Sequence, residues 1–176
     1  KAAIDVMEAN GTQRGDVVAF TGSDTLAKIP VLVGMFFSGR ISSALAPFAS
    51  APSRRHMLNE SGAKLLFVDR ATRHMAEEVM TDEYSCPIVE EESFTDLTAE
   101  IDPEELLVHA DRNKAGDWNT LRYTSGSTGT PKGMLLTHRS TELMTYNYIN
   151  RIGGVGLEGR FLCTMPLSSL EGCGMP

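Results

Sequence analysis

The alternation of short apolar runs with helix-like segments constrains the fold of this chain more than any other feature. Apolar runs typical of buried strands occupy residues 16–21, 41–45 and 64–68. Segments with helical features follow them at residues 23–38, 53–61 and 71–80. Strands that alternate with helices favour a parallel sheet with helices on its faces. We therefore expect an α/β fold with a mostly parallel sheet.

The first helical segment has an apolar stripe and clear end signals. Its apolar residues at helical spacing are Leu26, Ile29, Val33, Phe36 and Phe37. Ser23 or Asp24 is the expected N-cap, because a short oxygen-bearing side chain satisfies the free N–H groups of a first turn. Pro30 is compatible with the first turns of a helix, and Gly39 is the expected end.

Charge excludes some classes of partner. The 176 residues carry 23 acidic and 16 basic side chains, a net charge of −7, and no dense basic cluster. A nucleic-acid-binding surface is therefore not expected. Residues 77–105 hold 12 acidic residues and no Lys or Arg. We interpret this stretch as a solvated, loosely ordered surface crossing, with a site for a basic partner as the alternative.

Cysteine usage and hydropathy indicate the compartment. The cysteines, Cys86, Cys163 and Cys173, are odd in number and lack CxxC spacing, so neither a disulfide scaffold nor a zinc site is expected. The longest apolar run, residues 29–37, is too short to span a bilayer, and no signal peptide is readable. We expect a cytoplasmic protein without a transmembrane segment, with a peroxisomal location as the alternative.

The segment YTSGSTGTPKGMLLTH, residues 123–138, carries the most specific chemistry. Strands are expected at residues 119–124 and 133–137, with a Gly/Ser/Thr-rich loop between them. Its hydroxyl groups belong to Ser125, Ser127, Thr128 and Thr130. Its glycines, Gly126, Gly129 and Gly133, let backbone N–H groups converge on an anion. Lys132 adds a positive charge, so the loop is typical of a phosphate clamp.

This loop differs from the familiar nucleoside-triphosphatase loop. That motif requires Gly-Lys-Ser or Gly-Lys-Thr leading into a helix. Here Lys132 follows Pro131 and leads into an apolar strand-like segment. A ligand-free polar turn is the other interpretation, but background residue frequencies would produce this pattern on the order of once in ten million chains of this size. A strand–loop–strand phosphate clamp is the favoured geometry.

TSGSTGTPKG, followed by an apolar strand and Thr137-His138, resembles the phosphate-binding signature of the adenylate-forming enzymes. This superfamily includes acyl-CoA synthetases, 4-coumarate–CoA ligases, firefly-type luciferases and peptide-synthetase adenylation domains. The runs GDVVAF at 15–20 and SGAKLLFVD at 61–69 also resemble its amino-terminal subdomain. The resemblance implies the amino-terminal part of the acetyl-CoA-synthetase-like fold.

The resemblance implies a two-step reaction in which ATP activates a carboxylic acid as an acyl-adenylate. A thiol such as that of coenzyme A, or of a carrier, then takes the acyl group. The implied nucleotide contacts are Thr124, Ser125, Gly126, Ser127, Thr128, Gly129, Thr130, Lys132 and Gly133. Lys132 and Thr128 are the implied catalytic residues, and Thr128 is also the expected neighbour of Mg²⁺. Positioning and charge neutralisation supply most of the catalysis in such phosphoryl chemistry.

Residues 165–172, MPLSSLEG, resemble the next signature of the superfamily. Ser169 stands where that signature usually has His, and Ser168 replaces the usual aromatic residue. Ser169 can donate a hydrogen bond but cannot carry a positive charge. It is a candidate catalytic residue, with an ordinary loop serine as the alternative.

Two other patterns point away from function. Gly154, Gly156 and Gly159 have GxGxxG spacing, but here an expected helix, residues 138–152, precedes them and an expected strand, residues 160–165, follows. A dinucleotide fingerprint requires the reverse order, so we expect a turn. His138 is expected to begin the preceding helix.

We expect one partial AMP-binding domain over residues 1–176. Its first α/β portion is residues 1–118, and its phosphate-loop portion is residues 119–176. The adenine-binding segments and the carboxy-terminal domain of the superfamily have no counterpart before Pro176, so we expect the isolated chain to be inactive. A kinase or triphosphatase is disfavoured by the missing motifs. A non-catalytic family member that keeps nucleotide binding is the alternative that Ser169 supports.

Overall fold

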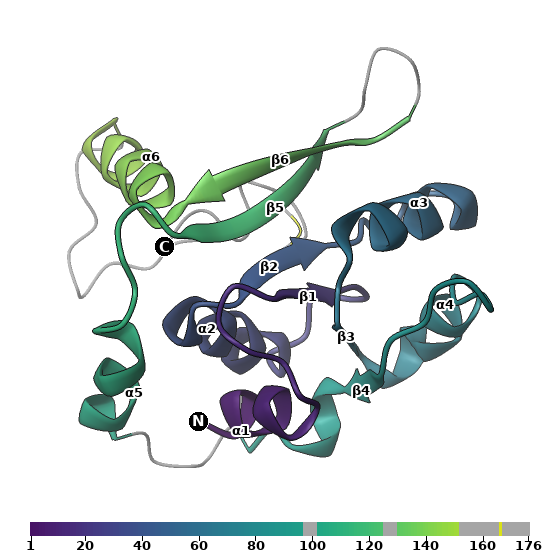
Figure 1. Ribbon diagram of the computed structural model, residues 1–176, viewed down its shortest axis with the longest axis horizontal. Helices are drawn as coiled ribbons and strands as arrows, with labels where there is room; N and C mark the ends of the chain where they lie inside the picture. Colours follow the sequence, from purple (N-terminus) through teal and green to yellow (C-terminus); the bar gives the residue numbers. More distant parts are fainter. Residues whose placement is uncertain (97–101, 125–129, 152–165, 167–176) are drawn as a thin grey trace.

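The computed structural model describes residues 1–96, 102–124, 130–151 and 166. A six-stranded sheet in the order β4-β3-β1-β2-β5-β6 forms the centre of this part (Figure 1). Its strands are β1 (Val17–Phe20), β2 (Ile41–Ala44), β3 (Leu65–Val68), β4 (Ile88–Glu90), β5 (Trp118–Thr124) and β6 (Lys132–Thr137). Strands β1 to β5 pair in parallel, and β6 is antiparallel to β5. The predicted mostly parallel α/β fold is confirmed.

Helices cover both faces of the sheet. They are α1 (Ala2–Ala9), α2 (Lys28–Ser38), α3 (Ala51–Ser61), α4 (Arg73–Glu77), α5 (Pro103–Ala110) and α6 (His138–Arg151). Figure 1 shows α1 and α2 on one face and α3 and α4 on the other. The loop 69–72 includes a short 3-10 helix, Arg70–Thr72, directly before α4. The helix expected at residues 71–80 is therefore shorter than predicted, since α4 covers only Arg73–Glu77. Helix α6 begins at His138 as predicted.

The period of two along each strand separates the core into two layers. Phe20 and Phe67 pack with α1 and α2, whereas Ala19, Leu66 and Val68 pack with α3 and α4. All four residues of β3 are buried, as expected for a strand inside a parallel sheet. Fully burying a side chain such as Phe67 contributes about 1.5–3 kcal/mol. The sheet is therefore held from both sides.

The predicted start of α2 is wrong, and its apolar stripe is not the face that the fold buries. The helix begins at Lys28, and neither Ser23 nor Asp24 caps it. The Ser23 N–H instead donates to the carboxylate of Asp69, because the chain turns toward the end of β3 before the helix starts. The predicted apolar stripe is largely exposed: Leu26, Ile29, Val33 and Phe36. The face against α1 includes Val31, Gly34 and Met35, and Gly34 permits the close approach because a Cβ there would lie 3.0 Å from Ala3 Cβ.

The interpretation of 77–105 as a loosely ordered crossing is also wrong for much of its described part. Residues 88–90 form β4 and pair with β3, and the side chain of Glu91 is fully buried. The segment resumes in α5, whose Asp102 N-cap accepts a hydrogen bond from the N–H of Glu104. The sequence did not reveal β4 because the strand has only three residues and lies in an acidic segment, so its apolar pattern is too short to recognise. Residues 97–101 lie outside the described part.

Candidate functional site

The base of the Gly/Ser/Thr-rich loop is a β-hairpin. Strands β5 and β6 pair in antiparallel register, with Tyr123 opposite Gly133 and Thr124 opposite Lys132. The predicted strand–loop–strand arrangement is therefore present. Residues Ser125, Gly126, Ser127, Thr128 and Gly129 lie outside the described part, as does Ser169, and their proposed roles stay predictions.

The hairpin loop begins at the carboxyl ends of the parallel strands, where open α/β sheets bind ligands. Because β5 runs parallel to β2, Thr124 lies at the carboxyl ends of the parallel strands. Figure 1 shows β5 and β6 extending together past the end of β2, on the side of α3. The candidate phosphate loop therefore starts at the expected end of the sheet.

The described residues next to the loop are open to solvent. Thr124, Thr130, Lys132 and Gly133 are all exposed. No residue of the described part forms an ion pair or hydrogen bond with the ammonium group of Lys132. This cation is therefore available to an anionic ligand. The structure brings these four predicted site residues together at the neck of the hairpin.

Helix α3 anchors the neck of the hairpin through contacts that the sequence did not predict. The Tyr123 hydroxyl donates to the Met57 carbonyl at 2.9 Å, and His56 Nε2 lies 3.1 Å from the Pro131 carbonyl oxygen. Burial raises the pKa of Tyr123 well above its usual range, and the nearby Glu60 carboxylate adds to this effect. The phenol therefore stays a donor. Only the position of Tyr123, two residues before the loop, offered a sequence signal.

Gly133 has a packing role at the neck as well as its predicted place in the loop. A Cβ at this position would lie 3.0 Å from Leu121 Cδ1 and 3.5 Å from Tyr123 Cε1. The contact with Leu121 is tighter than an ordinary van der Waals distance, so a side chain here would require the Leu121 side chain to shift by a few tenths of an ångström, whereas the distance to Tyr123 is ordinary. The small residue keeps β6 close to β5 beside the anchoring Tyr123.

A buried polar cluster also lies at the carboxyl ends of the parallel strands. It is formed by residues of α2 and of the segments that follow β1, β3 and β4. Lys28 Nζ lies 3.5 Å from Glu91 Oε1, and both side chains are almost completely buried. The Lys28 ammonium also donates to the carbonyls of Thr21 and Ser23. Burial raises the pKa of Glu91 to about 7, against the opposing effect of Lys28. This cluster holds the strand ends together.

Asp69 links the loops that follow β1 and β3. Its Oδ2 accepts from the Ser23 N–H at 2.6 Å and from the Thr72 hydroxyl at 2.8 Å. Burial alone would raise the pKa of Asp69, but these hydrogen bonds and the charge of Lys28 hold it below its usual value. Gly22 has φ +111°, and a Cβ there would lie 2.0 Å from Asp69 Oδ2, so only glycine fits. The sequence signal for this role was the position of Asp69, an acidic residue directly after the buried strand β3.

A small pocket of about 130 Å³ lies beside this cluster. It is lined by Gly22, Ser23, Asp24, Pro47, Phe48, Thr72 and Pro166. Within the described residues, no group of three or more His, Cys, Asp or Glu side chains is placed to hold a metal ion. The part of the chain that the structure describes also contains no helix long and apolar enough to cross a membrane.

Comparison with known families settles the class of protein. Residues 2–174 match the family of AMP-binding enzymes, which is nearly the whole chain. The chain belongs to this family. The match covers both the α/β portion and the hairpin, so the AMP-binding assignment does not depend on the loop motif alone.

Curated relatives of this member of the family include several kinds of adenylate-forming ligase. It is 31% identical over 137 residues to a fatty acid–acyl-carrier-protein ligase of Streptomyces coeruleorubidus, covering 76% of this chain and 25% of the relative. It is 25% identical over 183 residues to peroxisomal OPC-8:0-CoA ligase 1 of Arabidopsis thaliana, covering 98% of this chain and 33% of the relative. Tyrocidine synthase 3 of Brevibacillus parabrevis is 31% identical over 147 residues, 82% of this chain and 2% of the relative. The chain thus spans at most about a third of these relatives.

Solved structures show the same fold. O-succinylbenzoate coenzyme A synthetase of Bacillus subtilis, solved with ATP and a magnesium ion, aligns with a TM-score of 0.77 at 21% identity. That alignment covers 99% of this chain and 44% of the synthetase. A long-chain-fatty-acid CoA ligase of Rhodopseudomonas palustris aligns with a TM-score of 0.76 at 16% identity, over 98% of this chain and 44% of that protein. The described sheet is therefore that of the amino-terminal domain of adenylate-forming enzymes.

Proposed function

We propose that this chain is the nucleotide-phosphate-binding part of a ligase that joins a carboxylic acid to a thiol, with coenzyme A as the acceptor. The observation that carries the proposal is the hairpin neck: an exposed Lys132 that pairs with none of the described residues lies beside exposed hydroxyls at the carboxyl ends of the parallel strands. Membership of the adenylate-forming family supports it. Carrier-protein ligases and peptide synthetases among the relatives make a carrier thiol the other candidate acceptor.

The proposed reaction has two steps, formation of the acyl-adenylate and transfer of the acyl group to the thiol. A carboxylate oxygen attacks the α-phosphorus of ATP, the bond to the β-phosphate breaks, and pyrophosphate leaves. The thiol sulfur then attacks the acyl carbonyl carbon, the bond to AMP breaks, and the thiol proton passes to solvent. In the first step Lys132 neutralises charge on the departing phosphates, and the loop N–H and hydroxyl groups of 124–130 orient them.

Mg²⁺ enters this proposal with the nucleotide. The described residues provide no metal-binding cluster of their own, which fits an ion held mainly by the phosphates of ATP. When bound, the ion supplies charge neutralisation at the phosphates. Thr128 remains the proposed protein neighbour of the ion, and Ser169 a proposed hydrogen-bond donor near the reacting carboxylate.

Acid-dependent exchange of labelled pyrophosphate into ATP, measured on the protein that contains this chain, tests the proposal. One charge-assisted hydrogen bond to phosphate contributes about 1.5–3 kcal/mol, so Lys132→Ala should slow exchange by about tenfold to a hundredfold. Lys114→Ala, which removes another exposed lysine outside the hairpin, is the matched control and should exchange like the unaltered protein.

Two results would contradict the proposal. Undiminished exchange in Lys132→Ala would remove the loop assignment, and cleavage of ATP to ADP in place of AMP would indicate a kinase or triphosphatase. Nucleotide binding without exchange would favour the second candidate, a non-catalytic family member, for which Ser169 in place of the usual His is the specific support. The isolated 176 residues should bind nucleotide phosphates but not catalyse exchange.

A further inference from the structure

A cationic pocket lies at the amino ends of the parallel strands, whereas the hairpin neck lies at their carboxyl ends. Arg14 precedes β1 and Arg40 directly precedes β2, so both lie at the amino ends of the parallel strands. The pocket has a volume of about 310 Å³ and is lined by Glu8, Thr12, Gln13, Arg14, Ser38, Arg40, His109 and Arg112. Three guanidinium groups and one carboxylate therefore meet in one hollow, in a chain whose net charge is −7.

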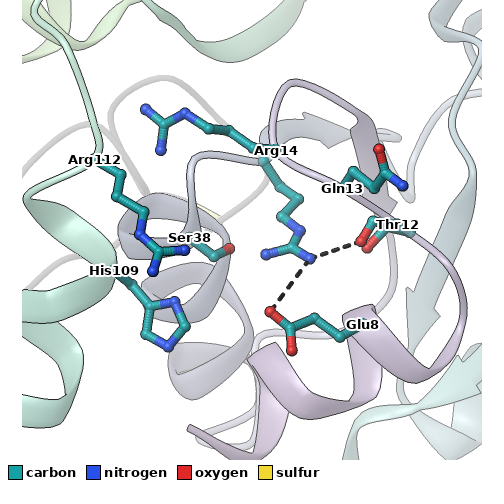
Figure 2. A pocket seen from close by; sticks show the side chains of 8 residues that line it. Glu8, Thr12, Gln13, Arg14, Ser38, His109 and Arg112 are labelled. Carbon is teal, nitrogen blue, oxygen red and sulfur yellow. Dashed lines mark hydrogen bonds and ion pairs between the residues drawn. The ribbon is translucent and has the colours of Figure 1, made fainter.

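Arg40 is buried yet incompletely paired. Only 4% of the residue is exposed, and its Nη2 donates to the Thr12 carbonyl at 2.7 Å. Its nearest carboxylate, Glu8, lies 3.9 Å away and is itself more than half exposed, so the charge is poorly compensated. These two interactions are the dashed lines in Figure 2. Among the residues that the structure describes, none accepts a hydrogen bond from the buried Nε–H of Arg40.

Arg112 supplies a second available cation. Figure 2 shows Arg112 and His109 extending from one side of the pocket, with Glu8 and Thr12 on the other. No described residue forms a hydrogen bond or ion pair with the Arg112 guanidinium. Arg14 differs, because its two Nη atoms already bind Asn113 and Asp117. Asp16, the other acidic group near Arg40, is paired with Lys64 at 2.8 Å.

Hydrogen bonds between distant segments hold the walls of the pocket. Asn113 Nδ2 lies 3.1 Å from both the Phe36 and the Phe37 carbonyl oxygens, which joins the segment after α5 to the end of α2. Asn113 also accepts from Arg14, which adds the segment before β1. Arg14 and the backbone segments that carry Arg40 and Arg112 are thus positioned before any ligand binds, which reduces the entropy cost of binding.

We propose that this pocket binds a phosphate group, as inorganic phosphate or as a small phosphate monoester. Guanidinium groups match the geometry of phosphate oxygens and bind them in bidentate fashion. A phosphate between Arg112 and Arg40 would compensate a buried charge that Glu8 leaves largely unneutralised. The site is separate from the hairpin neck and independent of the ligase proposal.

Titration of the ¹⁵N-labelled chain with inorganic phosphate at constant ionic strength tests this assignment. We expect a saturable shift of the Arg40 Nε–H resonance. Arg112→Ala should weaken binding by about tenfold or more, since one charge-assisted hydrogen bond is lost. Glu8→Gln should tighten binding, because Glu8 carries the only carboxylate among the described residues that line the pocket. Arg139→Ala, an exposed arginine on α6, is the matched control and should bind like the unaltered chain.

Lys132→Ala separates this pocket from the hairpin neck. The Arg40 shift should survive that substitution. An Arg40 resonance that does not respond to phosphate, or equal affinity in the Arg112→Ala and unaltered chains, would overturn the proposal. A parallel titration with glycerol 3-phosphate identifies the source of the group: tighter binding of the ester assigns a monoester, and tighter binding of inorganic phosphate assigns the free ion.

Discussion

At the scale of single residues, glycines and buried charges determine how closely the segments approach. Gly39 ends α2 in the left-handed conformation with φ +70°. A Cβ there would lie 2.6 Å from Arg14 Nη1 and 2.7 Å from Asn113 Oδ1. Gly62 ends α3 in the same conformation, at φ +60°, but has open space around it. The sequence predicted both helix ends, but only the structure distinguishes their surroundings.

These two glycines provide a matched prediction. An L side chain in the left-handed region costs about 1–2 kcal/mol, so both Gly39→Ala and Gly62→Ala should lower the free energy of unfolding. Gly39→Ala should cost about 1 kcal/mol more, because Arg14 and Asn113 must also move. Urea unfolding of the two variants measures the difference. Equal losses would show that the Arg14–Asn113 contact adapts without cost.

At the scale of elements, the period of apolar residues predicted β1, β2, β3 and the β5–β6 hairpin within one or two residues. It did not predict α1, which is short, or β4, which has three residues in an acidic segment. Both elements depend on partners that are remote in the sequence. Helix α1 packs on α2, and β4 pairs with β3, so their stability comes from contacts that no local pattern contains.

The α1–α2 contact gives the second prediction. A Cβ at Gly34 would lie 3.0 Å from Ala3 Cβ and 3.4 Å from Met7 Cε. Gly34→Val should therefore destabilise the protein by about 1–3 kcal/mol through overpacking. Val33→Ala, on the outward side of the same helix, should change stability by less than about 0.5 kcal/mol. Thermal or urea unfolding tests this, and an unaffected Gly34→Val variant would show that α1 is not packed closely on α2.

At the scale of the whole molecule, the two proposed binding sites lie at opposite ends of the parallel strands of one sheet, while much apolar surface stays open. Leu26 and Phe48 are 72% and 83% exposed, and the outward face of α2 is apolar. Exposed apolar patches of this kind usually mark surfaces that another protein segment or a partner covers. The polar cluster of Lys28, Asp69 and Glu91, in contrast, is enclosed and affects global stability through its charge.

Glu91 gives a prediction for the pH dependence of stability. Its folded-state pKa of about 7 lies above the ordinary value of 4.5, so between these values the folded state holds a proton that the unfolded state releases. The contribution of Glu91 is therefore complete below pH 4.5 and is lost as pH rises through about 7. From pH 5 to 8, Glu91→Gln should lose less unfolding free energy than the unaltered chain. Parallel pH profiles of the two proteins in urea unfolding would contradict this assignment.

The sequence by itself determined the alternating α/β pattern, the hairpin and the phosphate-loop motif, because period and motif are local properties of a chain. Only the tertiary structure decided that the outward stripe of α2 is exposed and that an acidic segment supplies β4. It also brought Arg14, Arg40 and Arg112 together, although Arg112 is 72 residues beyond Arg40 in the numbering of the chain. Such convergence depends on parallel strands aligning their ends, and one-dimensional spacing cannot reveal it.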